Sequence, residues 1–244
     1  MDLTGKRALR EMTGEFLDYL DDWREALAPV ILDAIVTEAG GPDHVGVFAV
    51  DVINGFCHEG ALASDRVYAI VEPIVRLFRN ADALGISNFV LMHDAHTPGA
   101  VEFDVYPPHC VRDTAESRIV PELMALSFAD KYHVLPKNCV HSAIGTGLNS
   151  WMAAHPEVTH RIVVGDCTDL CTFHMATYLQ FTANAVDKRA PVILPIDCVD
   201  TYDISLTVAH SQNIPAHPAD FFHSVFLYNM ALNGIRVVRQ IDRE

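Results

Sequence analysis

The strongest constraint on the fold is an alternation of two hydrophobic patterns that begins at Val45. Apolar, β-branched runs alternate with segments whose apolar residues recur at helical spacing, which is typical of a parallel sheet covered by helices. The runs predict strands over Val45–Val50, Asn88–His93, Tyr132–Leu135, Arg161–Val164, Val192–Ile196 and Ile235–Gln240. The other segments predict helices over Asp65–Leu84, Arg118–Ala125, Thr146–Ala154, Leu170–Ala183 and Ala219–Asn233. The sequence therefore predicts an α/β domain with three layers, α/β/α, around a six-stranded, mainly parallel sheet.

The segment before this alternation has a different character. From Leu9 to about Ala39, apolar residues recur at helical spacing among many acidic residues, and Gly40-Gly41-Pro42 ends the pattern. We expect one or two amphipathic helices that form an N-terminal helical extension over residues 1–42, ahead of a main domain over residues 43–244. Packing on the sheet or on a second subunit explains such helices better than a catalytic role does, and we expect a homo-oligomer.

The overall charge narrows the classes of partner. With 17 basic and 32 acidic residues, the 244-residue chain carries a formal charge of −15, which disfavours nucleic acids and anionic membranes because both are polyanions. No apolar run approaches the roughly 18 residues of a membrane span, and no signal-like segment opens the chain. We therefore expect a soluble, cytoplasmic protein whose six cysteines are reduced thiols rather than a disulfide framework.

A strand, a tight turn and a helix start follow one another around Gly165. The run Arg161–Val164 stops there, and a turn of small and polar residues leads to a helix that begins near Cys171. A cysteine at a helix N-terminus faces unpaired backbone N–H groups and the positive end of the helix dipole, and both stabilise a thiolate. Cys171 is therefore a candidate nucleophile, although a small buried hydrophobe that packs the helix onto the sheet would occupy the same position.

Charged residues follow other strands at the same edge of the sheet. Asp51 comes after the first predicted strand and Lys137 after the third, and ligands of such sheets bind beyond the carboxyl ends of the strands. Taken singly, each is explained by an exposed loop charge or an ion pair. Beside Cys171, however, a carboxylate could accept the thiol proton and later protonate a leaving amine, while a lysine would hold both anions. Together these three residues suit attack by a thiol on a carbonyl carbon.

A second group of residues has the character of metal ligands. Asp94 and His96 are two residues apart, so in an extended segment their side chains share a face. His109 follows a rigid Pro-Pro turn that could fix it as a third ligand, and Glu102 could be a fourth, either directly or through water. Two imidazoles and a carboxylate suit Zn²⁺, Fe²⁺ or Mn²⁺. A lone Asp-x-His pair also arises often by chance.

Several motifs occur in the order found in the isochorismatase-like cysteine hydrolases. They are Asp51-Val52-Ile53-Asn54-Gly55-Phe56-Cys57, the Asp94-x-His96 loop, Tyr106-Pro107-Pro108-His109-Cys110, Lys137-Asn138-Cys139 and Gly165-Asp166-Cys167-Thr168-Asp169-Leu170-Cys171. Within that superfamily the chain most resembles the nicotinamidases of the plant type. The similarity runs from about Val45 to Val238.

The resemblance implies a role for each residue of these motifs. Cys171 matches the nucleophile, Asp51 the general base and acid, and Lys137 the cation between them. The peptide bond between Asp166 and Cys167 is implied to be cis, so that the N–H groups of Cys167 and Cys171 form the oxyanion hole.

The substrate and metal positions follow in the same way. Asp94, His96 and His109 match metal ligands, and Glu102 matches the auxiliary acidic position of some members. Phe56 and Tyr106 match the aromatic residues that sandwich a pyridine ring in nicotinamidases. The resemblance thus implies metal-assisted hydrolysis of nicotinamide to nicotinate and ammonia through a thioester, a step of NAD salvage, with Zn²⁺ as the first choice of ion.

Two departures and three alternatives accompany this interpretation. The N-terminal helical segment is foreign to the family pattern, and Asn138–Ala143 lacks the aromatic that many nicotinamidases use as another pocket wall. A related amidase for carbamoyl or maleamic-type amides would often lack the metal ligands, which are complete here. A vinyl-ether-cleaving isochorismatase does not use the cysteine found at Cys171. A non-catalytic binding module would usually have lost a polar residue, and none is missing.

Overall fold

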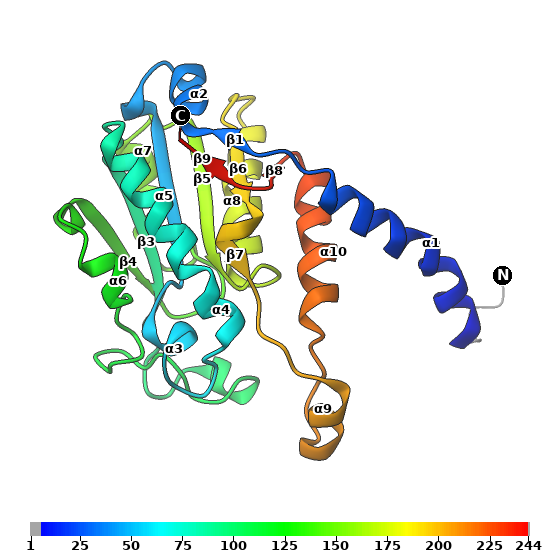
Figure 1. The fold of residues 1–244 in the computed structure, drawn as a ribbon. Helices are drawn as coiled ribbons and strands as arrows, with labels where there is room; N and C mark the ends of the chain where they lie inside the picture. Colours follow the sequence, from blue (N-terminus) through cyan, green and yellow to red (C-terminus); the bar gives the residue numbers. More distant parts are fainter. Residues whose placement is uncertain (1–5, 244) are drawn as a thin grey trace.

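The computed structural model describes residues 6–243, and within them the six predicted strands lie side by side in one parallel sheet (Figure 1). Across the sheet they are β4 (Tyr132–Lys137), β3 (Asn88–Asp94), β2 (Val45–Val50), β5 (His160–Asp166), β6 (Val192–Pro195) and β8 (Arg236–Val238). A seventh, two-residue strand, β7 (Val199–Asp200), pairs with the end of β5. The predicted fold class is confirmed, with one short strand more in this sheet than expected.

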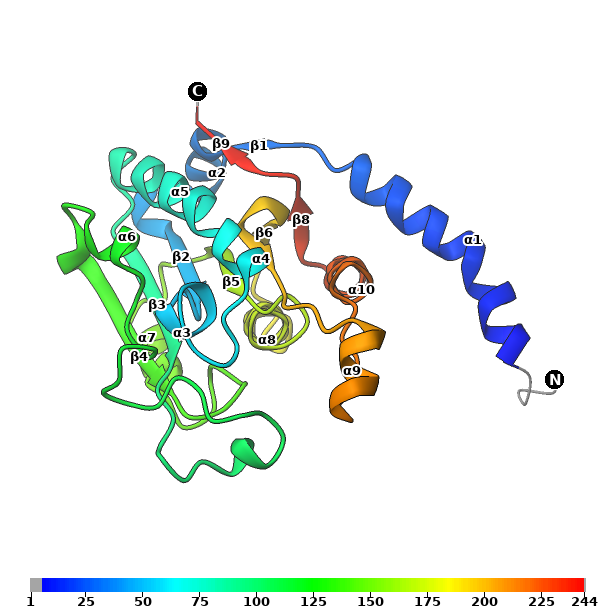
Figure 2. The ribbon, with the colours of Figure 1, turned by 60° about the horizontal axis from the view of Figure 1, so that its bottom comes forward.

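Helices cover both faces of this sheet (Figure 2). One face packs against α2 (Leu32–Ala39), α4 (Asp65–Ala69) and α5 (Val71–Ala83), and the other against α7 (Leu148–Ala154), α8 (Cys171–Asn184) and α10 (Ala219–Leu232). Side chains of β2 alternate between the two cores, as the period of two in a strand requires: Val47 and Ala49 face the first, Phe48 and Val50 the second. Both faces are therefore buried.

Prolines account for two differences from the predicted helices. The helix expected over residues 65–84 is interrupted at Ile70, because Pro73 has no N–H to donate to the carbonyl of Ala69. The helix expected over residues 118–125 is only α6 (Pro121–Met124), which opens on a proline. The remaining short helices are α3 (Asn54–Cys57), α9 (Leu206–Gln212), η1 (Pro42–His44), η2 (Val101–Asp104), η3 (Ala129–Lys131) and η4 (Ile196–Cys198).

The N-terminal segment contains two helices, where one or two were expected, and they differ in their packing. Helix α1 (Lys6–Glu25) projects from the main body, and its C-terminal half packs against α10 (Figure 1). Strand β1 (Val30–Ile31) then pairs in parallel with β9 (Ile241–Asp242) near the C-terminus. Helix α2 is part of the main body, because its Leu32 and Ile35 are fully buried in the core. The boundary at residue 42 and a contact of α1 with a second subunit stay predictions.

The order of the strands determines where a ligand can bind. The chain runs from β2 outward to β3 and β4, and then returns to the other side of β2 as β5. In such sheets the connections on the two sides of the reversal diverge and leave a crevice at the carboxyl ends of the strands. That crevice lies between the ends of β2 and β5.

Two sequence expectations concern the chain as a whole. All six cysteines are free, as predicted. None of the helices in residues 6–243 is long and apolar enough to span a membrane.

Candidate active site

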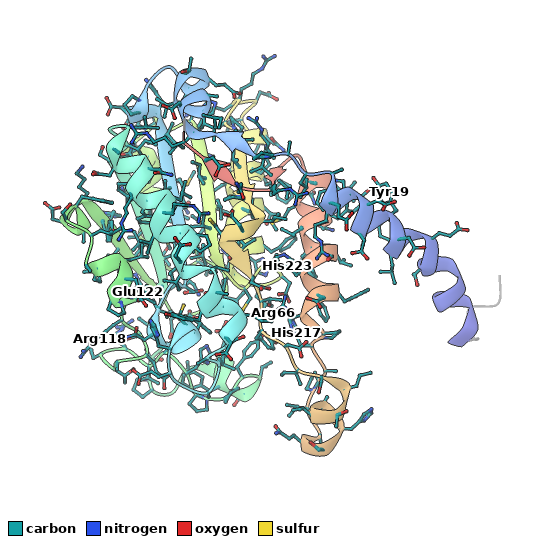
Figure 3. All side chains as sticks on the ribbon, viewed as in Figure 1. Tyr19, Arg66, Arg118, Glu122, His217 and His223 are labelled. Carbon is teal, nitrogen blue, oxygen red and sulfur yellow. The ribbon has the colours of Figure 1, made fainter. Side chains whose placement is uncertain are left out.

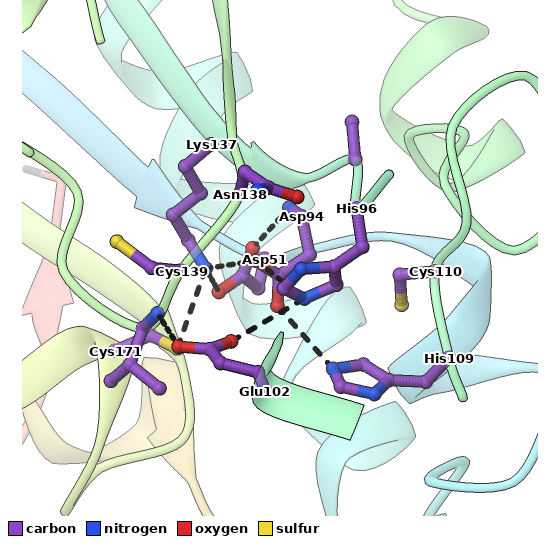
Figure 4. A network of polar contacts seen from close by, with 12 residues as sticks. Asp51, Asp94, His96, Glu102, His109, Cys110, Lys137, Asn138, Cys139 and Cys171 are labelled. Carbon is purple, nitrogen blue, oxygen red and sulfur yellow. Dashed lines mark hydrogen bonds and ion pairs between the residues drawn. The ribbon is translucent and has the colours of Figure 1, made fainter. Parts of the chain in front are cut away.

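Lys137 is the centre of a buried polar cluster at the end of the sheet (Figure 4). Its Nζ lies 2.8 Å from Asp51 Oδ2, 2.6 Å from Asp94 Oδ1 and 3.5 Å from Cys171 Sγ. Asp51 Oδ1 also accepts a hydrogen bond from the backbone N–H of Asp94, at 2.7 Å. The three residues predicted to form the catalytic trio are therefore together, and Asp94 joins them to the predicted metal ligands.

The electrostatics of the cluster follow from burial and from Lys137. Burial raises the pKa of the Cys171 thiol well above its usual value, and this outweighs the opposite effect of the lysine. Burial and the neighbouring Asp94 raise the pKa of Asp51 to about 6. Burial disfavours the ammonium of Lys137, but the two carboxylates outweigh that cost and raise its pKa. At rest the cysteine is thus a thiol beside a cation and a carboxylate.

The turn after β5 brings Cys171 into this cluster. Gly165 has a φ of +115°, and a Cβ there would lie 1.9 Å from the backbone oxygen of Val50, so glycine is required where the two strands touch. The peptide bond between Asp166 and Cys167 is cis. Cys171 is the first residue of α8, so its N–H is among those that the helix leaves without an intrahelical acceptor.

The predicted metal ligands also converge. The ligand atoms of Asp94, His96 and His109 all lie within 4.8 Å of one another, and all three residues are buried. His96 Nε2 lies 3.3 Å from Asp94 Oδ1 and 3.7 Å from Glu102 Oε2. Both ring nitrogens of His96 are buried without a hydrogen-bond partner, which a protein rarely tolerates unless something else binds there. This donor set fits a divalent cation.

Neighbouring backbone groups orient two of these side chains. His109 Nδ1 lies 2.8 Å from the carbonyl oxygen of Pro107, so Nδ1 carries the proton and Nε2 keeps its lone pair for a metal. His109 Nε2 faces Asp94 Oδ2 at 3.8 Å. Glu102 Oε1 accepts a hydrogen bond from the N–H of Val140, which leaves Oε2 toward His96.

A pocket beside Cys171 has apolar and aromatic walls. They are formed by Phe56, Leu62, Tyr106, Val140, Leu170 and Tyr202. The two predicted aromatics are present, and Tyr202 is an aromatic wall that the sequence analysis missed. Tyr202 comes from the loop after β7, and a strand of two residues is too short to show a hydrophobic pattern. The polar run Asp200-Thr201-Tyr202 after an apolar segment was the available signal.

Arg112, in the loop after His109, does not reach the pocket beside Cys171. It lines a separate cavity with Arg118 and His93, and its guanidinium donates to the backbone oxygen of Ala95. The walls of the pocket beside Cys171 include no arginine among the described residues.

Comparison with known proteins identifies the family. The sequence pattern of the isochorismatase domain matches residues 45–219, which is more than half of the chain. The chain belongs to the isochorismatase family. Nicotinamidase 1 of Arabidopsis thaliana is 31% identical over 223 residues, which cover 82% of this chain and 87% of the plant protein. The resemblance inferred from the motifs is confirmed, and with it the prediction that the protein is a hydrolase.

Solved structures share the fold. N-carbamoylsarcosine amidase from Thermoplasma acidophilum gives a TM-score of 0.58 at 21% identity, covering 80% of this chain and 95% of that chain. Pyrazinamidase of Pyrococcus horikoshii, in complex with zinc, gives a TM-score of 0.61 at 18% identity, covering 80% of this chain and 99% of that chain. At these identities the likeness establishes the three-layer fold of the isochorismatase family.

Proposed function

We propose that the protein is a metal-assisted cysteine amidohydrolase that converts nicotinamide to nicotinate and ammonia through a thioester. One observation carries the proposal: Lys137 Nζ lies 2.8 Å from Asp51 Oδ2 and 3.5 Å from Cys171 Sγ, so an acid–base group, a cation and a thiol share one buried centre. The 31% identity to a plant nicotinamidase supports nicotinamide as the amide.

Cys171 is the proposed nucleophile, and Asp51 accepts its proton. A carboxyl whose pKa is raised to about 6 is matched to take up and return a proton near neutral pH. Sulfur attacks the carboxamide carbon, and the oxygen that becomes negative accepts hydrogen bonds from the N–H groups of Cys167 and Cys171. Each such donor is worth roughly 3–4 kcal/mol in comparable sites. Asp51 then protonates the departing nitrogen, the C–N bond breaks, and ammonia leaves a thioester.

Water completes the reaction. Asp51 takes a proton from the water as its oxygen attacks the thioester carbon. The C–S bond breaks, Cys171 recovers a proton from Asp51, and the acid is released and loses its proton to solvent as nicotinate. Lys137 stays an ammonium throughout, because its pKa is raised by the carboxylates beside it despite burial.

The proposed metal ligands are Asp94, His96 and His109, with Glu102 binding directly or through water. A zinc-bound pyrazinamidase of the same fold supports Zn²⁺ over Fe²⁺ or Mn²⁺. A bound ion supplies a Lewis acid for the ring nitrogen of the substrate.

The pocket walls favour a flat ring over an open-chain acid. Phe56, Tyr106 and Tyr202 offer aromatic surface to a pyridine ring. A maleamic or carbamoyl substrate carries a carboxylate that needs a cation, and Lys137 is already engaged by two carboxylates. Arg112, a cation in the loop after His109, lines a different cavity.

Ammonia release from a panel of amides tests the proposal. Purified protein is assayed on nicotinamide, maleamate, a carbamoyl amino acid and an aliphatic amide, each with and without a chelator. We expect the highest kcat/KM for nicotinamide and a loss of rate with the chelator. Cys171→Ala should abolish release with little change in Tm, because alanine fits a helix start.

Two outcomes would contradict parts of the proposal. A higher kcat/KM for maleamate or the carbamoyl amino acid would refute the choice of nicotinamide. Ammonia release by Cys171→Ala at the wild-type rate would refute the nucleophile.

A further inference from the structure

Two histidines from the C-terminal part of the chain reach the turn between β5 and α8. His223 Nδ1 lies 2.9 Å from Thr168 Oγ1, and His217 Nε2 lies 2.8 Å from Asp169 Oδ2. Figure 3 shows both histidines where α10 meets the main body. The turn that carries Cys171 is therefore anchored from a segment outside the candidate catalytic cluster.

The hydrogen bonds of His217 define its charge. Its Nδ1 lies 2.8 Å from the backbone oxygen of Tyr202, and a carbonyl oxygen only accepts, so Nδ1 donates. Its Nε2 faces Asp169 Oδ2, and the other oxygen of that carboxylate already accepts from Thr201 Oγ1 at 2.6 Å. An ionised carboxylate has no proton to give, so Nε2 donates as well. These partners favour a proton on both ring nitrogens, so His217 is assigned as an imidazolium.

The electrostatics agree with this assignment. Burial lowers the pKa of His217, but the hydrogen bond and charge of Asp169 outweigh it and raise that pKa above its usual 6.5. Burial likewise raises the pKa of Asp169, but His217 and Thr201 outweigh it and lower that pKa below its usual 3.8. The two side chains form a buried ion pair.

No other charge on the described elements around His217 competes with Asp169 for it. In the loop after β7, burial raises the pKa of the Tyr202 phenol, which stays neutral, and Asp203 accepts a backbone N–H at the start of α10. On α10, Asp220 pairs with Arg66.

The ring of His217 also supports the pocket wall. It lies between Tyr202, with ring centroids 4.0 Å apart and planes at 15°, and Phe222, at 4.5 Å and 3°. A cation between two aromatic faces is attracted to both. Because Tyr202 lines the pocket beside Cys171, His217 backs the wall and the turn together.

We infer that His217 is a positioning residue for the amidase reaction, which as an imidazolium holds Asp169, the turn that carries Cys167 and Cys171, and the ring of Tyr202. This inference rests on the proposed function. Asp169 and His217 are both charged in the pH range between the lowered pKa of the aspartate and the raised pKa of the histidine. The contribution of His217 to kcat is therefore present below the histidine pKa, and it is lost as the pH rises through it.

NMR of the wild-type protein labelled with ¹⁵N-histidine tests the protonation directly, with the His217 signal assigned by its absence from His217→Gln. We expect both ring nitrogens of His217 to carry protons at pH 6.5, with a titration midpoint above that value. A ring with one proton at pH 6.5 would overturn the inference. This measurement needs no turnover, and the variant serves only to assign the signal.

Kinetics test the positioning role. We expect His217→Gln to lower kcat on the order of 10- to 100-fold at pH 6.5, because small misplacements of reacting groups have effects of this size. It should affect KM less and abolish the decline above the histidine pKa. Thr201→Val keeps the charges of Asp169 and His217. It should therefore keep the decline of kcat above the histidine pKa, with a smaller loss of kcat than His217→Gln. His210→Gln, an exposed histidine on α9, is the matched control and should match wild type.

The outcomes separate this inference from the proposed function. A wild-type kcat and pH profile in folded His217→Gln would overturn the positioning role. If wild type releases ammonia from no amide, the proposed function fails, and alkylation of Cys171 by iodoacetamide then replaces turnover as the readout. The inference predicts that His217→Gln changes the rate of alkylation and its pH dependence, and an unchanged rate would overturn it.

Discussion

At the scale of single residues, Asp51 is held in an unusual backbone conformation. Its φ of +56° lies in the left-handed region, which costs a residue with a side chain on the order of 1–3 kcal/mol. Its N–H donates to the carbonyl of Met92, and its Oδ1 accepts from the N–H of Asp94. These two bonds to β3 maintain the conformation, and Oδ2 is left for Lys137.

The aromatic pocket walls give a prediction at the same scale. A ring stacked between Phe56 and Tyr106 gains burial and stacking energy, each on the order of 1 kcal/mol or more. We therefore expect Phe56→Ala and Tyr106→Ala each to raise KM for nicotinamide by about 10-fold, equivalent to about 1.4 kcal/mol. Tyr106→Phe keeps the ring and should keep KM near wild type. Steady-state kinetics check this, and unchanged KM values in both alanine variants would show that the substrate lies elsewhere.

At the scale of elements, the sequence predicted the strands of the main sheet other than β7, but it did not predict the break between two helices. Strand β2 matches its prediction at both ends, because an apolar run bounded by polar residues is a clear pattern. The break between α4 and α5 depends on one missing backbone hydrogen bond at Pro73, which hydrophobic spacing does not reveal. Tyr202 was missed because a two-residue strand beside β5 has no periodicity.

The contact of β5 with β2 gives a second prediction. A Cβ at Gly165 would lie 1.9 Å from the oxygen of Val50, and neither strand can retreat without breaking the sheet. We expect Gly165→Ala to destabilise the fold by about 3 kcal/mol or more, which lowers Tm by roughly 6–12 °C in a chain of this size. Gly234→Ala is the matched control, because Gly234 also has a positive φ but nothing within 4 Å. Calorimetry that gave both variants the same Tm would rule out the steric explanation.

At the scale of the whole molecule, strand order explains why much of the site was predictable. Asp51 and Cys171 follow β2 and β5, and Lys137 ends β4. A parallel sheet brings the carboxyl ends of its strands to one edge. How deeply these side chains are buried was not predictable. The helix N-terminus at Cys171 suggested a stabilised thiolate, but the side chain is only 7% exposed, and burial raises the pKa of the thiol instead. A sequence pattern does not show how much protein covers a helix start.

The last prediction concerns removal of the metal ion from the whole protein. Two of the proposed ligands are anchored without it: Asp94 by Lys137 at 2.6 Å, and His109 by the carbonyl of Pro107 at 2.8 Å. Since these contacts stay when the ion is removed, the fold should lose little. Removal of the ion should weaken substrate binding more than it destabilises the fold, because the ion would contact the substrate ring.

Dialysis against a chelator, checked by elemental analysis, measures both effects on one sample. We expect KM for nicotinamide to rise by about 10-fold or more and to recover with added Zn²⁺. The Tm should fall by only a few degrees, since 1 kcal/mol corresponds to about 2–4 °C at this chain length. Phe181→Ala, on the exposed side of α8, is a control that should respond to the chelator as wild type does. Full activity in protein shown to be free of metal would exclude a role for the ion in binding, and collapse of the fold would mean that it is structural.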